Sequence, residues 1–265
     1  MKRIFTFFTL TILFSGSTLA QESSQLIKTI QKEVLEISTD RMGNLYLLEE
    51  NHIWKYSNQG DSLHEYNSKR YGKIQSIDTS DPYKILVFFQ DYAMVLILDN
   101  YLSPIGKAVD LNQLGYDQIT AVAHSREGGY WLFDRIHQKV YRLNNKWELS
   151  HESIKITQWF GNRLIPKEMV EINNKLYINE PDFGLFVFDH FATFMQKITM
   201  KSIHHLQVLD NKLYYVSNGE FCQFHLERLS KACKKLSEPN VEQARIEKNR
   251  LYTFDGLNTR IYKTN

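Results

Sequence analysis

The sequence predicts an all-β fold, a six-bladed β-propeller with four antiparallel strands in each blade. Three observations lead to this expectation: a short apolar run that recurs six times, a composition rich in strand-forming residues, and two chain ends that complement each other. With 15 Tyr, 16 Phe and 4 Trp among 265 residues, the chain is rich in side chains that fit a pleated, half-buried surface.

The recurring run marks one strand of each repeat. It reads LYLL at 45, ILVFF at 85, YWLF at 130, LYIN at 176, LYYV at 213 and LYTF at 251, at intervals of 40, 45, 46, 37 and 38 residues. Propeller blades repeat with such a period. Because the runs are apolar throughout, they indicate strands packed on both faces, as a blade is between its neighbours.

Further strands accompany each run. A weakly alternating segment precedes it, at 34–39, 74–79, 119–125, 168–173, 205–210 and 241–247. A second alternating segment often follows, at 53–56, 139–143, 185–188, 222–226 and 260–263. Fourth strands are expected at 62–67, 104–111 and 147–154. Four short antiparallel strands in each repeat predict propeller blades.

The two ends of the chain complete the ring. The last repeat stops at RIYKTN without a fourth strand, whereas QLIKTIQK (25–32) precedes the first repeat without a partner. If this N-terminal strand joins the last blade, the ring closes and an exposed sheet edge disappears. Rings of five or seven blades are the less favoured alternatives.

Residues 1–20 have the pattern of a secretory signal peptide, with a basic MKR, the apolar stretch IFTFFTLTILF and small residues up to Ala20. The apolar stretch is too short to span a bilayer, so a retained anchor is the less favoured alternative. Residue 21 is Gln, not the Cys of a lipid-modified N-terminus. We therefore expect residues 21–265 to form a single propeller domain that is periplasmic or secreted and does not span a membrane.

Charge argues against nucleic acid as a partner. Loss of Lys2 and Arg3 with the signal peptide lowers the Lys+Arg count from 32 to 30, against 30 Asp+Glu. A nearly neutral chain lacks the basic stripe that nucleic-acid binding usually requires.

The two cysteines, Cys222 and Cys233, are expected to form a disulfide. In an oxidising compartment so close a pair favours a disulfide over a metal site, which needs more ligands. If 221–226 and 230–235 are neighbouring strands, the two side chains can face each other. Two buried free thiols are the alternative.

Motifs for catalysis are absent. No G-x-S-x-G, H-E-x-x-H, C-x-x-C or phosphate-binding loop occurs, so no catalytic residue, metal ligand or cofactor is predicted. His204 and His205 are adjacent, but neighbours along a strand point to opposite faces and cannot both bind one metal without a bulge.

One long connection has the composition of a protein interface. The segment ITQWFGNRLIPKE (156–168) places Trp159, Phe160, Arg163 and Leu164 around a Gly-Asn turn. Loops between blades lie on a propeller face, and Trp with Arg is typical of interface hot spots. These four residues are the candidate partner-binding site. Inward packing of Trp159 at the end of an outer strand is the alternative.

Two stretches resemble the blades of NHL and regulator-type six-bladed propellers: TDRMGNLYLLEENHIWKYSNQG (39–60) and SREGGYWLFDRIHQKVYRLNN (125–145). Both have a turn with Gly, an apolar triplet with Tyr or Trp, a polar break, and a strand of the form I-x-K/R-Y/F or its close variant. The resemblance covers nearly the whole mature chain and implies the architecture, not an activity.

Related six-bladed propellers of the gluconolactonase type hold a divalent metal on the axis. Acidic residues near inner strands of this chain are Glu36, Asp78, Glu171 and Asp210. They precede the next apolar run by 9, 7, 5 and 3 residues, so they do not share one level along the axis. Turn capping is therefore the favoured interpretation, and a metal-dependent, lactonase-like hydrolase is the alternative function.

The size, composition and signal sequence are also similar to those of periplasmic accessory propellers, among them the plug of the type IX secretion translocon. Together with the absence of a reactive constellation, this similarity favours a non-catalytic periplasmic propeller that binds a partner protein. The resemblance implies an outer-membrane translocon as that partner, sealed at its periplasmic end.

Overall fold

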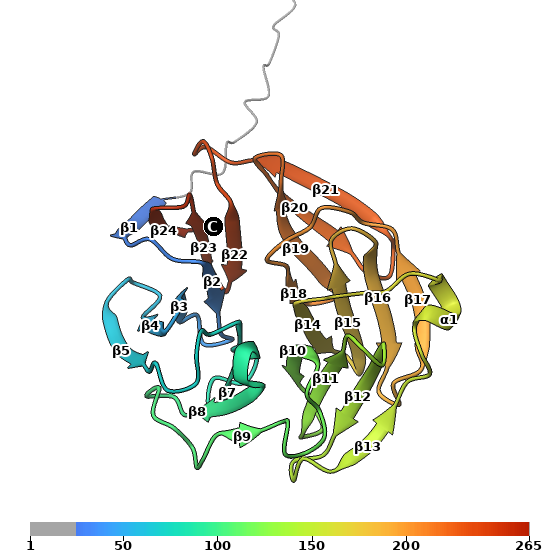
Figure 1. Ribbon diagram of the computed structural model, residues 1–265. Coiled ribbons are helices and arrows are strands. Elements are labelled where there is room, and N and C mark those ends of the chain that lie inside the picture. Colours follow the sequence, from blue (N-terminus) through green and yellow to red (C-terminus); the bar gives the residue numbers. More distant parts are fainter. Residues whose placement is uncertain (1–24, 265) are drawn as a thin grey trace, which may run out of the picture.

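The computed structural model describes residues 25–264, and the predicted signal peptide lies outside the described residues. These residues form six four-stranded antiparallel sheets arranged around a central axis (Figure 1). The predicted six-bladed propeller is confirmed. We number the blades 1 to 6 in the chain order of their innermost strands.

Each blade consists of four strands that follow one another from the axis outward. The innermost strands are β2 (Glu36–Thr39), β6 (Ser76–Asp78), β10 (Ile119–His124), β14 (Glu168–Ile172), β18 (Gln207–Leu209) and β22 (Gln243–Glu247). The second strands are β3 (Leu45–Glu49), β7 (Ile85–Phe89), β11 (Tyr130–Asp134), β15 (Lys175–Glu180), β19 (Lys212–Ser217) and β23 (Arg250–Phe254). The third strands are β4 (His52–Tyr56), β8 (Met94–Leu98), β12 (Lys139–Leu143), β16 (Gly184–Asp189), β20 (Glu220–His225) and β24 (Asn258–Lys263). The outermost strands are β5 (Ser62–Asn67), β9 (Val109–Asp110), β13 (Leu149–Glu152), β17 (Phe194–Ile198), β21 (Ser230–Lys235) and, for blade 6, β1 (Gln25–Gln31).

Two details differ from the expected strands. The fourth strand expected at 104–111 is reduced to β9, and Pro104 forms only an isolated bridge to Leu98. Proline has no N–H to donate to a ladder, which accounts for the short pairing.

The connection at 156–168 contains a one-turn helix, α1 (Thr157–Phe160), and a 3-10 helix spans Gln90–Tyr92. Within residues 25–264, neither helix nor any other is long and apolar enough to cross a membrane.

The ring is closed by the N-terminal strand, as predicted. Strand β1 pairs antiparallel with β24, so that Leu26 lies opposite Tyr262 and Thr29 opposite Arg260. Figure 1 shows β1 beside β24 at the outer edge of blade 6. The two ends of the described chain therefore share one sheet.

Burial on both faces explains why the second strands are apolar throughout. All five residues of β7 are buried. Ile85, Val87 and Phe89 pack into the cluster between blades 1 and 2, whereas Leu86 and Phe88 pack into the cluster between blades 2 and 3. A strand whose two faces are both buried against neighbouring blades needs apolar residues at successive positions, so it does not alternate between apolar and polar residues.

Cationic side chains of third strands also connect neighbouring blades. Lys55 of blade 1 is 2% exposed and donates to the backbone oxygen of Asn100 in blade 2 at 2.7 Å. Arg142 of blade 3 makes the equivalent bond to the backbone oxygen of His190 in blade 4 at 3.0 Å. In both cases the acceptor lies in the turn between the third and fourth strands of the next blade.

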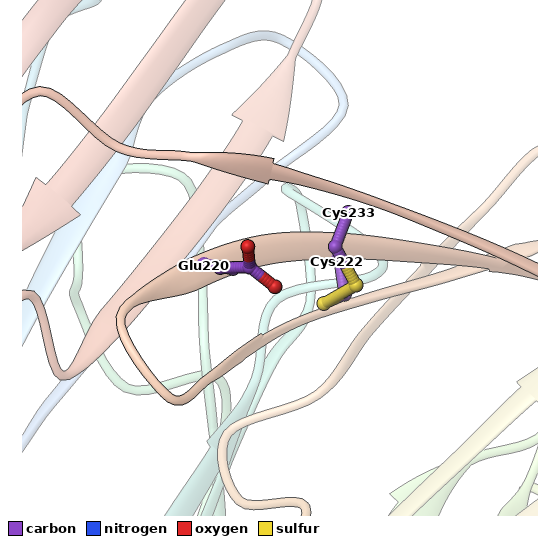
Figure 2. A group of neighbouring side chains, drawn as sticks. All are labelled: Glu220, Cys222 and Cys233. Carbon is purple, nitrogen blue, oxygen red and sulfur yellow. A yellow bond between two sulfur atoms is a disulfide. The ribbon is translucent and has the colours of Figure 1, made fainter.

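The predicted disulfide is confirmed. Cys222 of β20 lies directly opposite Cys233 of β21, and their sulfur atoms are bonded at 2.06 Å (Figure 2). The bridge joins the two outer strands of blade 5, away from the axis.

Candidate functional site

The innermost strands enclose a cavity of about 1260 Å³, which we call the axial channel. Glu36 and Glu168, at the beginnings of β2 and β14, line it, as do Asp78 and His124 at the ends of β6 and β10. Because the innermost strands run in the same direction around a propeller axis, these two pairs lie toward opposite mouths of the channel.

Arg245, in the middle of β22, joins three blades at the mouth where the innermost strands begin. Its Nε donates to the backbone oxygen of Ile37 at 3.0 Å, and its Nη1 donates to the backbone oxygen of His205 at 2.7 Å. Its Nη2 lies 3.6 Å from Oε1 of Glu36, too far for a hydrogen bond. The side chain is 6% exposed, and burial lowers its pKa. The guanidinium is therefore fixed by two hydrogen bonds, while Nη2 has only the ion pair with Glu36 among the described residues.

Glu36 is the counter-ion of Arg245, yet its carboxyl group makes no hydrogen bond to any residue of the described chain. Its side chain keeps 20% of its exposure. Burial raises the pKa of Glu36 to about 7, an effect that Arg245 opposes and Glu168 strengthens. Near neutral pH the protonated form of this carboxyl group is consequently accessible.

Glu168 and His205 form the adjoining part of the mouth. Oε1 of Glu168 accepts a bond from the backbone N–H of His205 at 2.8 Å, and Oε2 accepts one from Nδ2 of Asn179 at 2.9 Å. Nδ1 of His205 is buried without a hydrogen-bond partner in the described chain, 3.9 Å from Oε1 of Glu168. Burial lowers the pKa of His205, which favours its neutral form.

The four acidic residues considered for an axial metal take different roles. Oδ2 of Asp78 accepts from the backbone N–H of His124 at 2.8 Å, and Oε2 of Glu171 accepts from Nε1 of Trp131 at 2.5 Å. Both are thus acceptors that connect neighbouring blades. Asp210 lies exposed in the turn after β18, with a φ of 48°. Of the four, Glu36 and Asp210 have carboxyl groups without a hydrogen bond within residues 25–264, and of these two Glu36 lines the axial channel.

In the described part of the chain, one group of potential metal ligands converges: Glu220, Cys222 and Cys233, whose ligand atoms lie within 4.8 Å of one another (Figure 2). The two sulfur atoms are bonded to each other, so the group is a disulfide beside a carboxylate. The adjacent His204 and His205 precede β18 and are not in a strand, so the expected alternation does not govern them. Both line the axial channel, His204 as an exposed residue and His205 as a partly buried one.

The aromatic pair of the predicted partner-binding loop packs inward. Trp159 and Phe160 form the end of α1 and are half-buried. Their ring centroids lie 4.9 Å from Phe194 and 4.9 Å from Phe186, respectively. Trp159 therefore packs inward, as the alternative interpretation of the sequence expected. It does so from a helical turn, however, and not from the end of an outer strand.

The other two residues of that loop differ from each other. Leu164 has no exposed surface and belongs to the core between blades 3 and 4, so its side chain cannot contact a partner. Arg163 is exposed, and its Nη2 donates to the backbone oxygen of Arg135 at 3.0 Å. Partner binding by Trp159, Phe160 and Arg163 stays a prediction.

Three exposed isoleucines lie within this loop, just before it, or in the turn to which Arg163 is hydrogen-bonded, and the sequence pattern does not single them out. Ile136, Ile154 and Ile165 are 52%, 53% and 55% exposed, and we call them the isoleucine patch. Gln138 holds the segments that carry them: its side chain accepts from the N–H of Leu164 at 2.7 Å and donates to the oxygen of that residue at 2.8 Å. The three lie in turns and connections, where no periodicity marks an apolar residue as exposed.

Arg245 and Glu168 are likewise not singled out by the sequence patterns. One feature of the sequence could have pointed to Arg245: it is a basic residue in the middle of VEQARIE, a segment expected to form an inner strand. The alternation of that segment does not show which residue would pair with it. Its contacts, Ile37 and His205, belong to other blades and are not deducible from local sequence.

The sequence matches no known family model and no curated protein. Among solved structures, the chain is similar to virginiamycin B lyase from Staphylococcus aureus, with 12% identity over 88% of this chain and 82% of that one and a TM-score of 0.59. It is also similar to the Cps50 (Swd1) β-propeller domain of Myceliophteria thermophila, with 11% identity over 92% and 100% of the two chains and a TM-score of 0.62. BamB from Moraxella catarrhalis shares 11% identity over 87% and 69% of the two chains, with a TM-score of 0.50.

These comparisons give no support to the resemblance to the type IX plug. At such low identity, a likeness in structure shows the fold and leaves the activity open. The chain has the β-propeller fold, here with six blades.

Proposed function

We propose that the protein is a non-catalytic propeller of the cell envelope that binds a partner protein through the face on which the isoleucine patch lies. The patch is the observation that carries this proposal. Ile136, Ile154 and Ile165 each leave about half of their surface in water. Hydrogen bonds of Gln138 and Arg163 bring together the backbone segments that carry them. Exposed apolar side chains that gather in one place are typical of interaction sites.

The patch is held rigidly, which favours binding. Gln138 is 3% exposed, and its side-chain amide is hydrogen-bonded to the segments that carry two of the isoleucines. Its backbone oxygen accepts a hydrogen bond from the N–H of Ile156 at 2.8 Å. On the other side, the N–H of Ile165 donates to Oε2 of Glu180 at 2.7 Å. A surface that is ordered before a partner arrives loses little conformational entropy on binding.

Position in the fold supports docking on a face of the disc. Ile154 and Ile165 flank α1 in the connection from β13 to β14, and Ile136 lies in the turn between β11 and β12. Both kinds of connection belong to the face on which the innermost strands begin. Loops on a rigid scaffold are the usual place for binding residues.

The residue roles also support a function without catalysis. Asp78 and Glu171, the candidates for an axial metal, accept hydrogen bonds between blades through Oδ2 and Oε2, while Oε1 of Glu171 is buried without a partner in the described chain. The proposal includes export: the N-terminal sequence pattern and the disulfide between Cys222 and Cys233 both suit an oxidising compartment outside the cytoplasm.

The partner class that we propose is an outer-membrane protein complex, a secretion translocon of the type IX kind being the specific candidate. This identification rests on the similarity of size, composition and signal sequence. A disc with a rigid apolar patch on one face is suited to covering the mouth of a pore.

Site-specific photo-crosslinking in envelopes of the native host tests the proposal. A photoreactive residue is placed at Ile136 or Ile165, and the matched control is Leu63 of β5, which is 42% exposed on another blade. We expect a discrete adduct with an outer-membrane protein from the patch positions and none from Leu63. Adducts at all three positions alike, or at none, contradict the proposed docking face.

Mass analysis of the protein recovered from the envelope tests the export step separately. An N-terminus at Gln21 is expected. Retention of residues 1–20 contradicts export by a cleaved signal.

A further inference from the structure

The Nη2 edge of Arg245, which has the ion pair with Glu36 at 3.6 Å but no hydrogen bond in the described chain, offers hydrogen-bond donors to a ligand in the axial channel. A guanidinium has five N–H donors. Nε and Nη1 of Arg245 bond to backbone oxygens of blades 1 and 5, whereas Nη2 has no hydrogen bond in the described chain. Because two bonds already fix the group, a carboxylate can bind Nη2 without ordering a flexible side chain.

Glu36 is placed to complete this site. Its carboxyl group lies 3.6 Å from Nη2 of Arg245 and forms no hydrogen bond within residues 25–264. Desolvation raises the pKa of Glu36 to about 7, so the protonated form is accessible near neutrality. A protonated carboxyl group is a donor, and beside Nη2 it gives two adjacent donors for one carboxylate.

Glu168 offers the opposite charge a short distance away. One residue connects it to Arg245: the N–H of His205 donates to Oε1 of Glu168, and the oxygen of His205 accepts from Nη1 of Arg245. The side chain of Glu168 is 27% exposed in the channel. Each of its two carboxylate oxygens accepts one hydrogen bond and can therefore accept another. Arg245, which can bind an anion, and Glu168, which can bind a cation, are thus both hydrogen-bonded to the backbone of His205.

Simpler ligands satisfy only part of this arrangement. A carboxylate alone leaves Glu168 without a counter-ion and brings a second anion beside it. An amine alone leaves Nη2 of Arg245 with Glu36 at 3.6 Å and without a hydrogen-bond acceptor in the described chain. A divalent metal needs three or more converging ligand atoms, and no such group of His, Cys, Asp and Glu occurs in the described residues of the channel. With Glu36 protonated, a zwitterion pairs both Arg245 and Glu168.

The walls next to the charged mouth add a preference for an apolar side chain. Leu35, Leu48, Ile74, Val170 and Leu206 line the channel along with the charged groups. The volume of about 1260 Å³ leaves ample room for a small molecule.

We infer that the axial channel binds a small apolar α-amino acid as a zwitterion, with its carboxylate on Arg245 and Glu36 and its ammonium group on Glu168. This site is separate from the isoleucine patch, and its existence does not depend on the proposed docking of a partner protein.

Calorimetric titration of the mature protein with three isosteric probes tests the inference. The probes are leucine, 4-methylpentanoate, which lacks the amine, and isopentylamine, which lacks the carboxylate. We expect leucine to bind at least about tenfold more tightly than either analogue, because each analogue loses one charge-assisted pair. Equal affinity for leucine and one analogue, or no leucine binding at millimolar concentration, overturns the inference.

Variants assign the charges. Glu168→Gln is expected to weaken leucine binding about tenfold and to leave the affinity for 4-methylpentanoate unchanged or higher. The matched control is Glu33→Gln, which neutralises an exposed carboxylate on the same segment as Glu36 but outside the channel lining. Loss of leucine binding in the control, or unchanged binding in Glu168→Gln, contradicts the assignment.

The pH dependence tests the role of Glu36. The charged and titratable groups that act on it are Arg245 and Glu168, with His204 and His205 beside them. Leucine binding should weaken as pH rises above about 7, because an ionised Glu36 repels the ligand carboxylate. Glu36→Gln, whose amide still donates, should bind leucine with little change over that range. A parallel decline in both proteins rules out this role.

Discussion

Nε1 of Trp131 in blade 3 donates a hydrogen bond of 2.5 Å to Oε2 of Glu171 in blade 4. The same oxygen accepts from the backbone N–H of Arg126 at 3.2 Å. Trp131 has no exposed surface and Glu171 is 5% exposed. Innermost strands of neighbouring blades belong to separate sheets, so side chains such as Glu171 satisfy the polar groups between them.

Removal of the Glu171 carboxylate should therefore destabilise the fold. Glu171→Ala leaves the indole N–H of Trp131 and the N–H of Arg126 unpaired inside the protein, and we expect a loss of about 3 kcal/mol in the free energy of unfolding. Glu171→Gln keeps one acceptor and should lose less. Urea unfolding measures both, with Glu33→Ala as an exposed control. A loss in Glu171→Ala no larger than in the control contradicts this role.

The buried amine of Lys55 permits a sharper comparison. Its Nζ donates to the backbone oxygen and to Oδ1 of Asn100, at 2.7 and 2.6 Å, and burial lowers the pKa of Lys55. Lys55→Ala removes both bonds and leaves a cavity, for which we expect a loss of about 3 kcal/mol.

Lys55→Met fills the same space without a charge to desolvate, so it should be clearly less destabilising than Lys55→Ala. The free energies of unfolding of the two variants, measured in urea at one pH, decide the point. Equal losses would mean that packing of the aliphatic stem contributes little.

Stability should depend on pH through Glu36. The pKa of Glu36 is raised from 4.5 to about 7 in the folded protein, so the unfolded chain gives up this proton first. Between pH about 4.5 and about 7 the folded state binds more protons, and the free energy of unfolding therefore falls as pH rises, by about 3 kcal/mol at most.

Glu36→Gln removes this contribution. The difference in unfolding free energy between the variant and the native protein should grow in favour of the variant from pH 5 to pH 8, a range that spans the folded pKa of about 7. Urea unfolding at several pH values measures it. Other buried carboxyl groups with raised pKa values, Glu180 and Glu247, act in both proteins and cancel in the difference. A difference that does not change with pH contradicts the buried, weakly paired state of Glu36.

The disulfide should contribute to stability through the unfolded chain. Cys222 and Cys233 are 11 residues apart, and closing a loop of this size corresponds to about 3 kcal/mol in the chain-entropy description. Cys222→Ala with Cys233→Ala should lower the free energy of unfolding by about 2 to 3 kcal/mol, and adding a reductant to the double variant should have no further effect. An unchanged unfolding midpoint would show that the hairpin of β20 and β21 opens independently of the rest.

The fold follows from the sequence because its main signal is local and repeated. Six apolar runs at regular spacing determine the blades, and the burial of β7 on both faces accounts for the pattern in ILVFF. The pairing of β1 with β24 was also deducible, since one blade lacks a strand and the other end of the chain supplies one.

The channel mouth depends on contacts that local sequence does not encode. Nε of Arg245 bonds to the oxygen of Ile37, 208 residues away along the chain. Likewise, Leu164 is a core residue because Gln138 fixes its backbone against blade 3, a relation that the composition of the loop does not reveal. Repetition predicts where strands lie, whereas the side chains that meet between blades depend on the register of the whole ring.

Amide hydrogen exchange of the mature protein, resolved by residue, tests the closed ring most directly. Strand β1 pairs with β24 from Gln25 opposite Lys263 to Gln31 opposite Asn258. Because β1 is the outermost strand, we expect the amides that face β24 to be protected to the same degree as those of β23, and the others to exchange freely. Exchange of every β1 amide at the rate of an unstructured peptide, while β22 and β23 stay protected, would contradict the closure.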